Sequence, residues 1–416
     1  MPEHHQRARP GGRLISALVG SWMLLSQPVW AEFSIPGYEL VYNAPQETML
    51  QDNDLRNAAE VWQQMFDAAQ SHIDLAQFYV ANEQGSLLDG VLKHLRTAGE
   101  RGVKIRFLME KKGIDLSTPE TLAALKTIPN LELRIIPFHR LTGGIVHAKY
   151  LLVDGKEAFV GSQNFDWRAL EQIQETGLRI SDAQVVRQIQ AIFDQDWQAQ
   201  ALLAENKPVP KLAWQAPDSV PYGNYLVASP RDYNPSGVID SQVELPRLLG
   251  NAKSRIRVQV MDYAPLSWGE KGSRSFYAPV DNALRSAAAR GVQVELMVAD
   301  WNLKKPDVFW LKSLSLVPNV RLKVVTIPPA SIGFIPFARV VHSKLMTIDG
   351  ATAWVGTSNW SGGYFDNSRN LELVLNNVQM TRRIDALYDQ LWNSRYAELI
   401  KIDFDYPTPH PGREHE

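Results

Sequence analysis

The chain has 416 residues with an ordinary soluble composition, 45% hydrophobic and 21% charged, and this length allows two or three domains with ample core. The net charge of −2 gives no overall basic field that would draw the chain to nucleic acid, and no acidic block that indicates a disordered tail. The absence of cysteine excludes disulfides, thiolate metal sites and a cysteine nucleophile.

Residues 1–31 have the composition of a secretory signal peptide. Three arginines precede the apolar stretch 14–25, and Ala31 ends a cleavage site of small or aliphatic residues. The stretch is shorter than the roughly 20 residues that a transmembrane helix needs. Loss of this leader, with three arginines and one glutamate, takes the net charge from −2 to −4. We therefore expect a periplasmic or secreted protein with no transmembrane anchor.

Helical and extended patterns alternate after the leader. Apolar residues recur at helical spacing in some segments, and short apolar runs lie between them. Strands that alternate with helices predict parallel pairing, with helices on both sheet faces. In chain order the expected elements are a helix (55–69), a strand (73–80), a helix capped by Ser86, a strand (103–109), a helix that begins at Thr118-Pro119 and a strand (131–136).

The same series recurs in the second half of the chain. Short phrases match at an offset that grows from 183 (71 to 254) to 197 (175 to 372). A proline-rich stretch separates the two copies and predicts a linker. The expected organisation is a signal peptide (1–31), a first α/β half (32–204), a linker (205–222), a second α/β half (223–405) and a tail (406–416).

One motif is present twice. Residues 147–164 read HAKYLLVDGKEAFVGSQN, and residues 342–359, which begin 195 positions later, read HSKLMTIDGATAWVGTSN. Residues i and i+2 of a strand share a face, so each copy presents its histidine and lysine together. The Asp-Gly dipeptides that follow are typical of hairpin turns. Two copies face to face would place two histidines and two lysines around one anion, and this set can cleave a phosphodiester without a metal.

This doubled His-x-Lys-x4-Asp pattern, with its trailing Gly-Ser/Thr-x-Asn, resembles the phospholipase D superfamily over the whole chain after the leader. The resemblance implies two fused α/β sandwich halves related by a pseudo-twofold axis, with one active site at their interface and no metal or cofactor. It also implies that one histidine attacks phosphorus and becomes a phosphohistidine. The other histidine protonates the leaving alcohol and then activates water.

The resemblance assigns roles to particular residues. The lysines would hold the non-bridging oxygens, and Glu175 and Glu372 match the family glutamate that orients each histidine. Assigning His147 as the nucleophile and His342 as the acid is an analogy, because the sequence is nearly symmetric. The aspartates stand at Asp-Gly turns, where a structural role is at least as common as a chemical one. The candidate catalytic residues are His147, Lys149, Asp154, Glu175, His342, Lys344, Asp349 and Glu372, and the candidate phosphate-binding residues are Ser162, Asn164, Thr357 and Asn359.

Two phrases, 161–177 and 356–365, resemble the branch of the superfamily that contains the animal family members three and four. That branch implies 5′-exonuclease action on single-stranded DNA and RNA, and lipid synthesis. The chain differs from it in having no cysteine and a cleavable leader. We expect a single-stranded nucleic acid as substrate, with bases stacked on aromatic residues near the cleft. The candidates for stacking are Trp167, Trp301, Trp360 and Tyr364.

Two other functions stay open. A phospholipase D or transphosphatidylase acting on phospholipids would contact a membrane surface transiently through the apolar loop 327–337, although ordinary packing explains that loop better. An inactive phosphate-binding scaffold is disfavoured by two intact motifs. His139, eight residues before His147, is a candidate for the mouth of the site. A homodimer is not required, because both half-sites lie in one chain.

Overall fold

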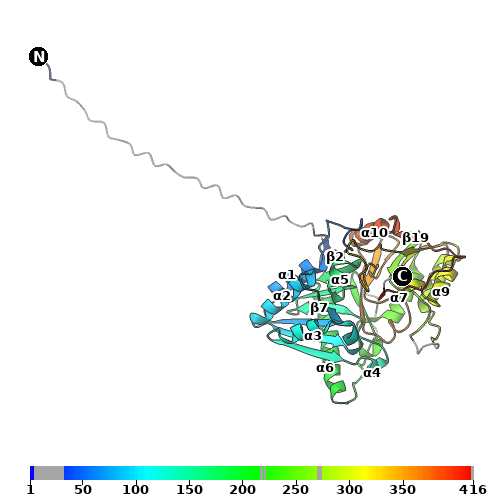
Figure 1. The fold of residues 1–416 in the computed structure, drawn as a ribbon, viewed down its shortest axis with the longest axis horizontal. Helices are drawn as coiled ribbons and strands as arrows, with labels where there is room; N and C mark the ends of the chain where they lie inside the picture. Colours follow the sequence, from blue (N-terminus) through cyan, green and yellow to red (C-terminus); the bar gives the residue numbers. More distant parts are fainter. Residues whose placement is uncertain (4–31, 216–218, 220–221, 269–273, 414–416) are drawn as a thin grey trace.

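The computed structural model describes residues 1–3, 32–215, 219, 222–268 and 274–413. Most of the expected leader and part of the expected linker therefore lie outside the described residues. Within these ranges no helix is long and apolar enough to cross a membrane. Figure 1 shows the first half of the chain, with α1, α2 and α3, on the left, and the second half, with α7 and α9, on the right.

The first half begins at residue 34 and ends with a long helix. Its elements in chain order are β1 (Ser34–Ile35), β2 (Tyr38–Asn43), α1 (Ala58–Ala68), β3 (His72–Gln77), β4 (Val80–Ala81), α2 (Leu87–Glu100), β5 (Lys104–Glu110), η1 (Lys111–Leu116), α3 (Pro119–Lys126), β6 (Leu131–Ile136), α4 (His139–Thr142), β7 (Lys149–Val153), β8 (Glu157–Gly161), β9 (Phe165–Asp166), α5 (Trp167–Glu171), β10 (Glu175–Ile180) and α6 (Ala183–Ala204).

The second half repeats most of this series. Its elements are β11 (Tyr225–Ser229), η2 (Arg231–Tyr233), β12 (Ile239–Asp240), α7 (Ser241–Asn251), β13 (Arg255–Val260), α8 (Pro279–Ala289), β14 (Gln293–Ala299), η3 (Asp300–Leu303), α9 (Asp307–Ser315), β15 (Val320–Val325), β16 (Leu345–Ile348), β17 (Thr352–Gly356), β18 (Asn370–Leu375), α10 (Val378–Trp392) and β19 (Ala397–Leu399).

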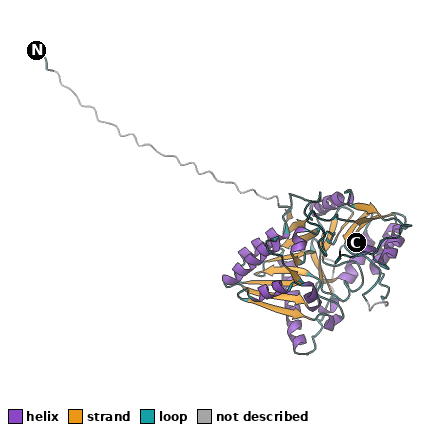
Figure 2. Cartoon of the chain, in the orientation of Figure 1, coloured by secondary structure: helices purple, strands orange, loops and turns teal. Residues whose placement is uncertain are grey.

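Each half is built around one mixed sheet (Figure 2). Among the described residues the strand orders are β1-β2-β10-β8-β7-β3-β5-β6 and β12-β11-β18-β17-β16-β13-β14-β15-β19. The strands β3, β5 and β6 pair in parallel, as do β13, β14 and β15. The motif strands pair antiparallel, because the Asp-Gly turns fold β7 onto β8 and β16 onto β17. The α/β class is confirmed, but the expected parallel pairing holds for only part of each sheet.

Local signals place these elements as the sequence indicates. Ser86 caps α2 by accepting from the Asp89 N–H. The hairpin turns have the left-handed conformation that favours Asp-Gly, with φ of 53° at both Asp154 and Asp349. Both turns confirm the hairpin prediction, and they set the register of the strands that carry the motif lysines.

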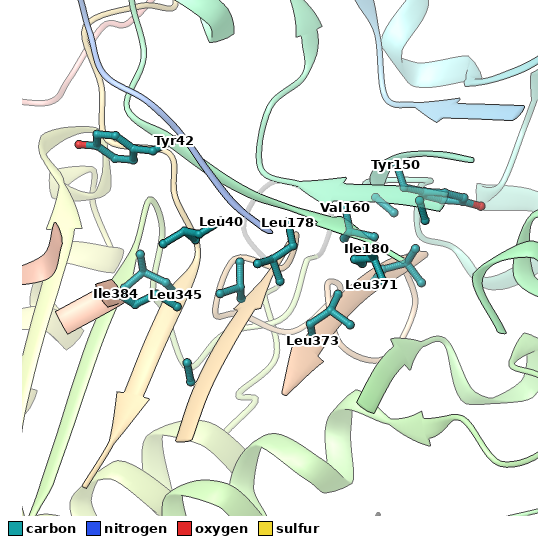
Figure 3. Close-up of a cluster of buried hydrophobic side chains, with 14 of the residues drawn as sticks. Leu40, Tyr42, Tyr150, Val160, Leu178, Ile180, Leu345, Leu371, Leu373 and Ile384 are labelled. Atoms are coloured by element: carbon teal, nitrogen blue, oxygen red, sulfur yellow. The ribbon is translucent and has the colours of Figure 1, made fainter. Parts of the chain in front are cut away.

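Three buried clusters separate the layers. One cluster packs α1 and α2 on the outer face of the first sheet, and another packs α7, α8 and α9 on the second. The largest cluster lies between the two sheets, together with α6 and α10. In it Val160 and Leu178 of the first sheet pack with Leu371 and Leu373 of the second (Figure 3). Because this apolar core joins the two sheets, burial holds the halves in one arrangement.

Candidate active site

Each His-x-Lys segment is hydrogen-bonded to the opposite half of the chain. The His147 N–H donates to the Arg369 carbonyl at 3.0 Å, and the His342 N–H donates to the Gln174 carbonyl at 2.8 Å. Both contacts belong to isolated parallel bridges between the halves. The two motif copies therefore meet at the interface, and each copy is held by the half that carries the other.

The two histidines have different partners at Nδ1. His342 Nδ1 lies 2.9 Å from each carboxylate oxygen of Glu175. His147 Nδ1 lies 3.1 Å from Oδ1 of Asn370, which also accepts from Thr357 Oγ1 at 2.8 Å. An Nδ1–H that donates to these oxygens leaves Nε2 for the chemistry. Each histidine is thus oriented by a side chain from the other half.

The two motif histidines and the two motif lysines are concentrated in a buried space. His147 and His342 are 6% and 8% exposed, and Lys149 and Lys344 are 1% and 0% exposed. The Nζ of each lysine donates to the carbonyl of its own motif histidine at 2.5 Å. Burial and the neighbouring ammonium groups lower the pKa of both histidines, and burial lowers the pKa of Lys344 to about 7. A bound phosphodiester would bring negative charge to these basic groups and favour their protonated forms.

The prediction that Glu372 orients a histidine is wrong. Its carboxylate accepts from Ser241 Oγ at 2.6 Å and also from Ser358 Oγ. Burial raises the pKa of both Glu372 and Glu175 to about 7, so the shift alone does not distinguish the residue that meets a histidine from the one that does not.

The strand register explains the error. Gly161 pairs with Gly177 in the first sheet, and Gly356 pairs with Glu372 in the second. Glu372 is therefore the counterpart of Gly177, and the counterpart of Glu175 lies two residues earlier, at Asn370. The sequence does contain this signal: the offset of 195 between the motif histidines also leads from 175 to 370.

Asp154 and Asp349 lie away from the histidines, so including them among the catalytic residues is wrong. Asp154 accepts from the backbone N–H groups of Ser71 and His72 at 2.8 and 2.9 Å, and Asp349 does the same at 254–255. These hydrogen bonds hold the pKa of Asp154 below its usual range, although burial acts in the opposite direction. Five strand residues of about 3.3 Å each separate Asp154 from the motif histidine. The aspartates secure the far ends of the hairpins.

The four predicted phosphate-binding residues gather at the ends of β8 and β17. The hydroxyls brace the neighbouring strands, because Ser162 Oγ donates to Thr176 O at 3.2 Å and Thr357 Oγ1 donates to Asn370. The asparagines differ, because the buried Oδ1 atoms of Asn164 and Asn359 have no hydrogen-bond partner among the described residues. A flip of either amide would present Nδ2 at that place as a donor to a phosphate oxygen.

Two partly exposed rings lie against His147, and a third packs on one of them. The Tyr364 ring centroid lies 4.8 Å from the imidazole, and the Phe78 centroid lies 5.9 Å from it. Trp268 extends this group, with its ring 4.7 Å from that of Tyr364. Tyr364 was an expected stacking residue, whereas Phe78 and Trp268 were missed, because neither has a distinctive sequence pattern and the fold alone brings them beside His147.

The expected tryptophans lie elsewhere. Trp360 is 1% exposed and packs on Trp354 in the core, so its predicted role in base stacking is wrong. Trp167 packs against the cores. Trp301 lines a cavity of about 250 Å³ together with Arg339 and Phe334. Among the described residues no group of three or more His, Cys, Asp or Glu side chains is arranged to hold a metal ion.

Paired histidines and lysines at the interface of two related mixed sheets define a phosphodiesterase. A family model described as "Cardiolipin synthase, PLD-like domain" matches residues 63–197 and 245–392. The chain therefore belongs to the phospholipase D superfamily and is a phosphodiesterase of that family. This confirms the resemblance that the doubled motif carries.

Curated relatives cover most of the chain. It is 30% identical to the 5′-3′ exonuclease PLD3 of Xenopus laevis, over 86% of this chain and 80% of that protein. It is also 30% identical to phospholipase D Z of Dictyostelium discoideum, over 81% and 85%. The 5′-3′ exonuclease PLD4 of Homo sapiens is 28% identical, over 91% and 83%.

Solved structures share the fold at low identity. The phosphatidylserine synthase of Haemophilus influenzae superposes with a TM-score of 0.56 at 8% identity, covering 82% of this chain and 85% of that one. The polyphosphate kinase of Porphyromonas gingivalis gives 0.53 at 14% identity, covering 90% and 51%. These likenesses support the architecture of the two halves.

Glu175→Gln is expected to lower kcat about 10²-fold or more, because the amide leaves the His342 imidazolium without its carboxylate. Glu372→Gln is the matched control. Its carboxyl group is as buried as that of Glu175, but it accepts hydrogen bonds from serines and does not meet a histidine. Steady-state hydrolysis of a phosphodiester, with thermal melting of both variants, measures the difference. Equal losses of kcat at equal stability would contradict the assignment of Glu175.

Proposed function

We propose that the chain hydrolyses single-stranded nucleic acid as a 5′-exonuclease, through a phosphohistidine intermediate and without a metal. The observation that carries this proposal is the group of partly exposed rings formed by Phe78, Tyr364 and Trp268 beside His147. Bases stack on aromatic side chains without regard to sequence, each contributing about 1–3 kcal/mol. Relatives named 5′-3′ exonucleases, at 28–30% identity, support the same substrate class.

The unequal partners of the histidines favour His147 as the nucleophile and His342 as the acid. A proton on His342 faces the Glu175 carboxylate at 2.9 Å, so the protonated pair carries no net charge. A proton on His147 would create a buried cation opposite the neutral Asn370 amide and near two ammonium groups. Burying an unpaired charge is costly, so the proton belongs on His342 and the neutral lone pair on His147.

Bond making and breaking follow from this assignment. His147 Nε2 attacks phosphorus as the bond to the leaving oxygen breaks, and His342 Nε2 gives that oxygen its proton. His342 then takes a proton from water, whose oxygen attacks phosphorus and displaces His147. Lys149 and Lys344 hold the non-bridging oxygens as negative charge develops on them.

A phospholipase D or transphosphatidylase function is the second candidate. The loop 327–337 exposes Ile332 and Phe337, at 76% and 44%, and these are side chains that enter lipid interfaces readily. Ile335 of the same loop is buried, so part of the loop serves packing instead. An inactive scaffold is the weakest reading, because both histidines and both lysines converge at the interface.

We also propose that the protein is exported from the cytoplasm. The arginines and the apolar stretch 14–25 of the leader favour export through a cleaved signal peptide, and hence a periplasmic or secreted enzyme. Transient contact with a membrane surface would arise only under the lipid alternative.

A side-by-side assay tests the substrate. With excess EDTA present, the protein is expected to shorten 5′-hydroxyl single-stranded DNA and to release no headgroup from phosphatidylglycerol vesicles. Mononucleotide release and free glycerol are the readouts, and a variant with both His147→Ala and His342→Ala is the blank. Product from the vesicles alone would remove the nuclease proposal, and loss of all turnover in EDTA would remove the metal-free mechanism.

A good leaving group separates the roles of the histidines. Nitrophenolate departs without protonation, so His342→Ala is expected to release about one nitrophenolate per site from bis(4-nitrophenyl) phosphate and then stall. The stalled protein should carry a 4-nitrophenyl phosphoryl group on His147, which mass spectrometry detects. His147→Ala should give no burst. A burst from His147→Ala, with the 4-nitrophenyl phosphoryl group on His342, would reverse the two roles.

The rate is expected to fall as the pH rises through about 7. Lys344 is charged below its lowered pKa of about 7 and loses its charge above it. Burial lowers the pKa of His147, so this nucleophile stays neutral into mildly acidic solution. A profile of kcat/KM against pH reports these groups in the free enzyme, and circular dichroism at each pH controls for unfolding. A rate that rises steadily from neutral to alkaline pH would contradict the assignment.

A further inference from the structure

The two halves differ in charge at the turn that follows the central parallel strand. His72 pairs with Lys104 at the start of β5, and its counterpart Arg255 pairs with Gln293 at the start of β14. Both strands have seven residues, so the turns after them correspond. The first half has Lys111-Lys112 in this position, and the second half has Asp300-Trp301.

The lysine turn lies at the edge of the sheet where the active site is. The Glu110 carboxylate ends β5 and accepts from the Val146 N–H at 2.8 Å, one residue before His147. Gly113 lies against the Phe78 backbone so closely that a Cβ would come within 1.8 Å of the Phe78 carbonyl oxygen. The Phe78 ring is in turn 5.9 Å from the His147 ring. The turn is therefore tied to the nucleophile through two separate contacts.

Two more basic residues lie beside this turn. Glu110 pairs with Ile136 in the parallel ladder, so the segment after β6 emerges at the same edge. This segment carries His139 and Arg140, both exposed. Lys111, Lys112 and Arg140 act together with burial to lower the pKa of His139, as expected for neighbouring positive charges. We call Lys111, Lys112, His139 and Arg140 the basic edge.

One carboxyl group, that of Glu110, interacts with the basic edge: burial raises its pKa to about 7, and the Lys112 charge acts to lower it. In the described part of the chain none of the four members of the basic edge forms an ion pair, including with Asp115 on the same turn. Arg140 donates to neutral oxygens, the Leu203 carbonyl at 3.0 Å and Asn206 Oδ1 at 2.9 Å. In a protein with a net charge of −2, such an edge creates a local positive field beside the site.

We propose that the basic edge binds the phosphates of a single-stranded nucleic acid beyond the scissile bond, so that the strand leaves the site over the first half. The inference rests on the proposed nuclease function and extends it to the path of the strand. Successive phosphates are matched by point charges set along one edge, and aromatic rings beside His147 receive the terminal base.

The test compares two pairs of lysines on the same sheet. Lys111→Gln with Lys112→Gln removes two charges from the basic edge. Lys104→Gln with Lys156→Gln removes two exposed charges from the opposite edge, where β5 begins and the β7–β8 hairpin turns, and it is the matched control. Hydrolysis of a single-stranded oligonucleotide and of bis(4-nitrophenyl) phosphate is measured over a series of salt concentrations.

The basic-edge variant is expected to retain kcat on the oligonucleotide and to raise KM, with a greater loss of kcat/KM than on the nitrophenyl ester. The slope of log(kcat/KM) against log salt concentration should become shallower by about 1.4, about 0.7 for each phosphate contact removed. The control pair should keep the wild-type slope. A basic-edge variant with the wild-type KM and slope would overturn the inference.

Binding measurements distinguish this inference from the proposed function. If wild-type protein does not cleave the oligonucleotide, the nuclease proposal fails, and fluorescence anisotropy of the labelled oligonucleotide still tests the basic edge. A salt-dependent loss of oligonucleotide affinity in the basic-edge variant, and not in the control pair, would support the inference. Equal affinities of the two variants would overturn it. Weaker binding to phosphatidylglycerol vesicles, with oligonucleotide binding unchanged, would overturn it in favour of a lipid surface.

Discussion

The site depends on the crossed hydrogen bonding between the halves. The backbone before β10 holds the segment of His342, and the backbone before β18 holds the segment of His147. Arg369 strengthens this crossing, because its guanidinium binds both oxygens of Asp196 on α6 at 2.8 and 2.9 Å. The two side chains are 0% and 1% exposed, and breaking such a pair leaves a buried charge that costs about 3–5 kcal/mol. Neither half can move without separating a histidine from its partner.

A crossed arrangement lets two similar halves perform different tasks. In a strictly symmetric site both histidines would share one kind of partner and one protonation state. Here a carboxylate faces His342 and an amide faces His147, so the two histidines favour different protonation states, as the proposed acid and nucleophile would need. The halves also differ at the turn after the central parallel strand, which is Lys111-Lys112 in the first half and Asp300-Trp301 in the second. Small differences between repeated halves therefore supply direction to a duplicated scaffold.

The sequence predicted the framework well and the partners less well. Helix caps, the hairpin turns and β6 lie where local patterns indicated, because these depend on residues close in the chain. The role of Glu372 was predicted wrongly, because Glu175 and Glu372 appear equivalent when gaps are allowed in aligning the two halves. Only the ladder, in which Gly356 faces Glu372, shows that the true counterpart of Glu175 is Asn370.

The sequence by itself determined the duplicated motif, the superfamily and the four side chains that meet at the interface of the halves, because these are properties of residue identity and spacing. The tertiary structure alone decided which partner each histidine meets, which rings surround His147 and which charges line the edge beside it. The partners of the histidines are distant in the chain, with 167 positions between Glu175 and His342. Packing between sheets decides such contacts, since no local propensity links one half of the chain to the other.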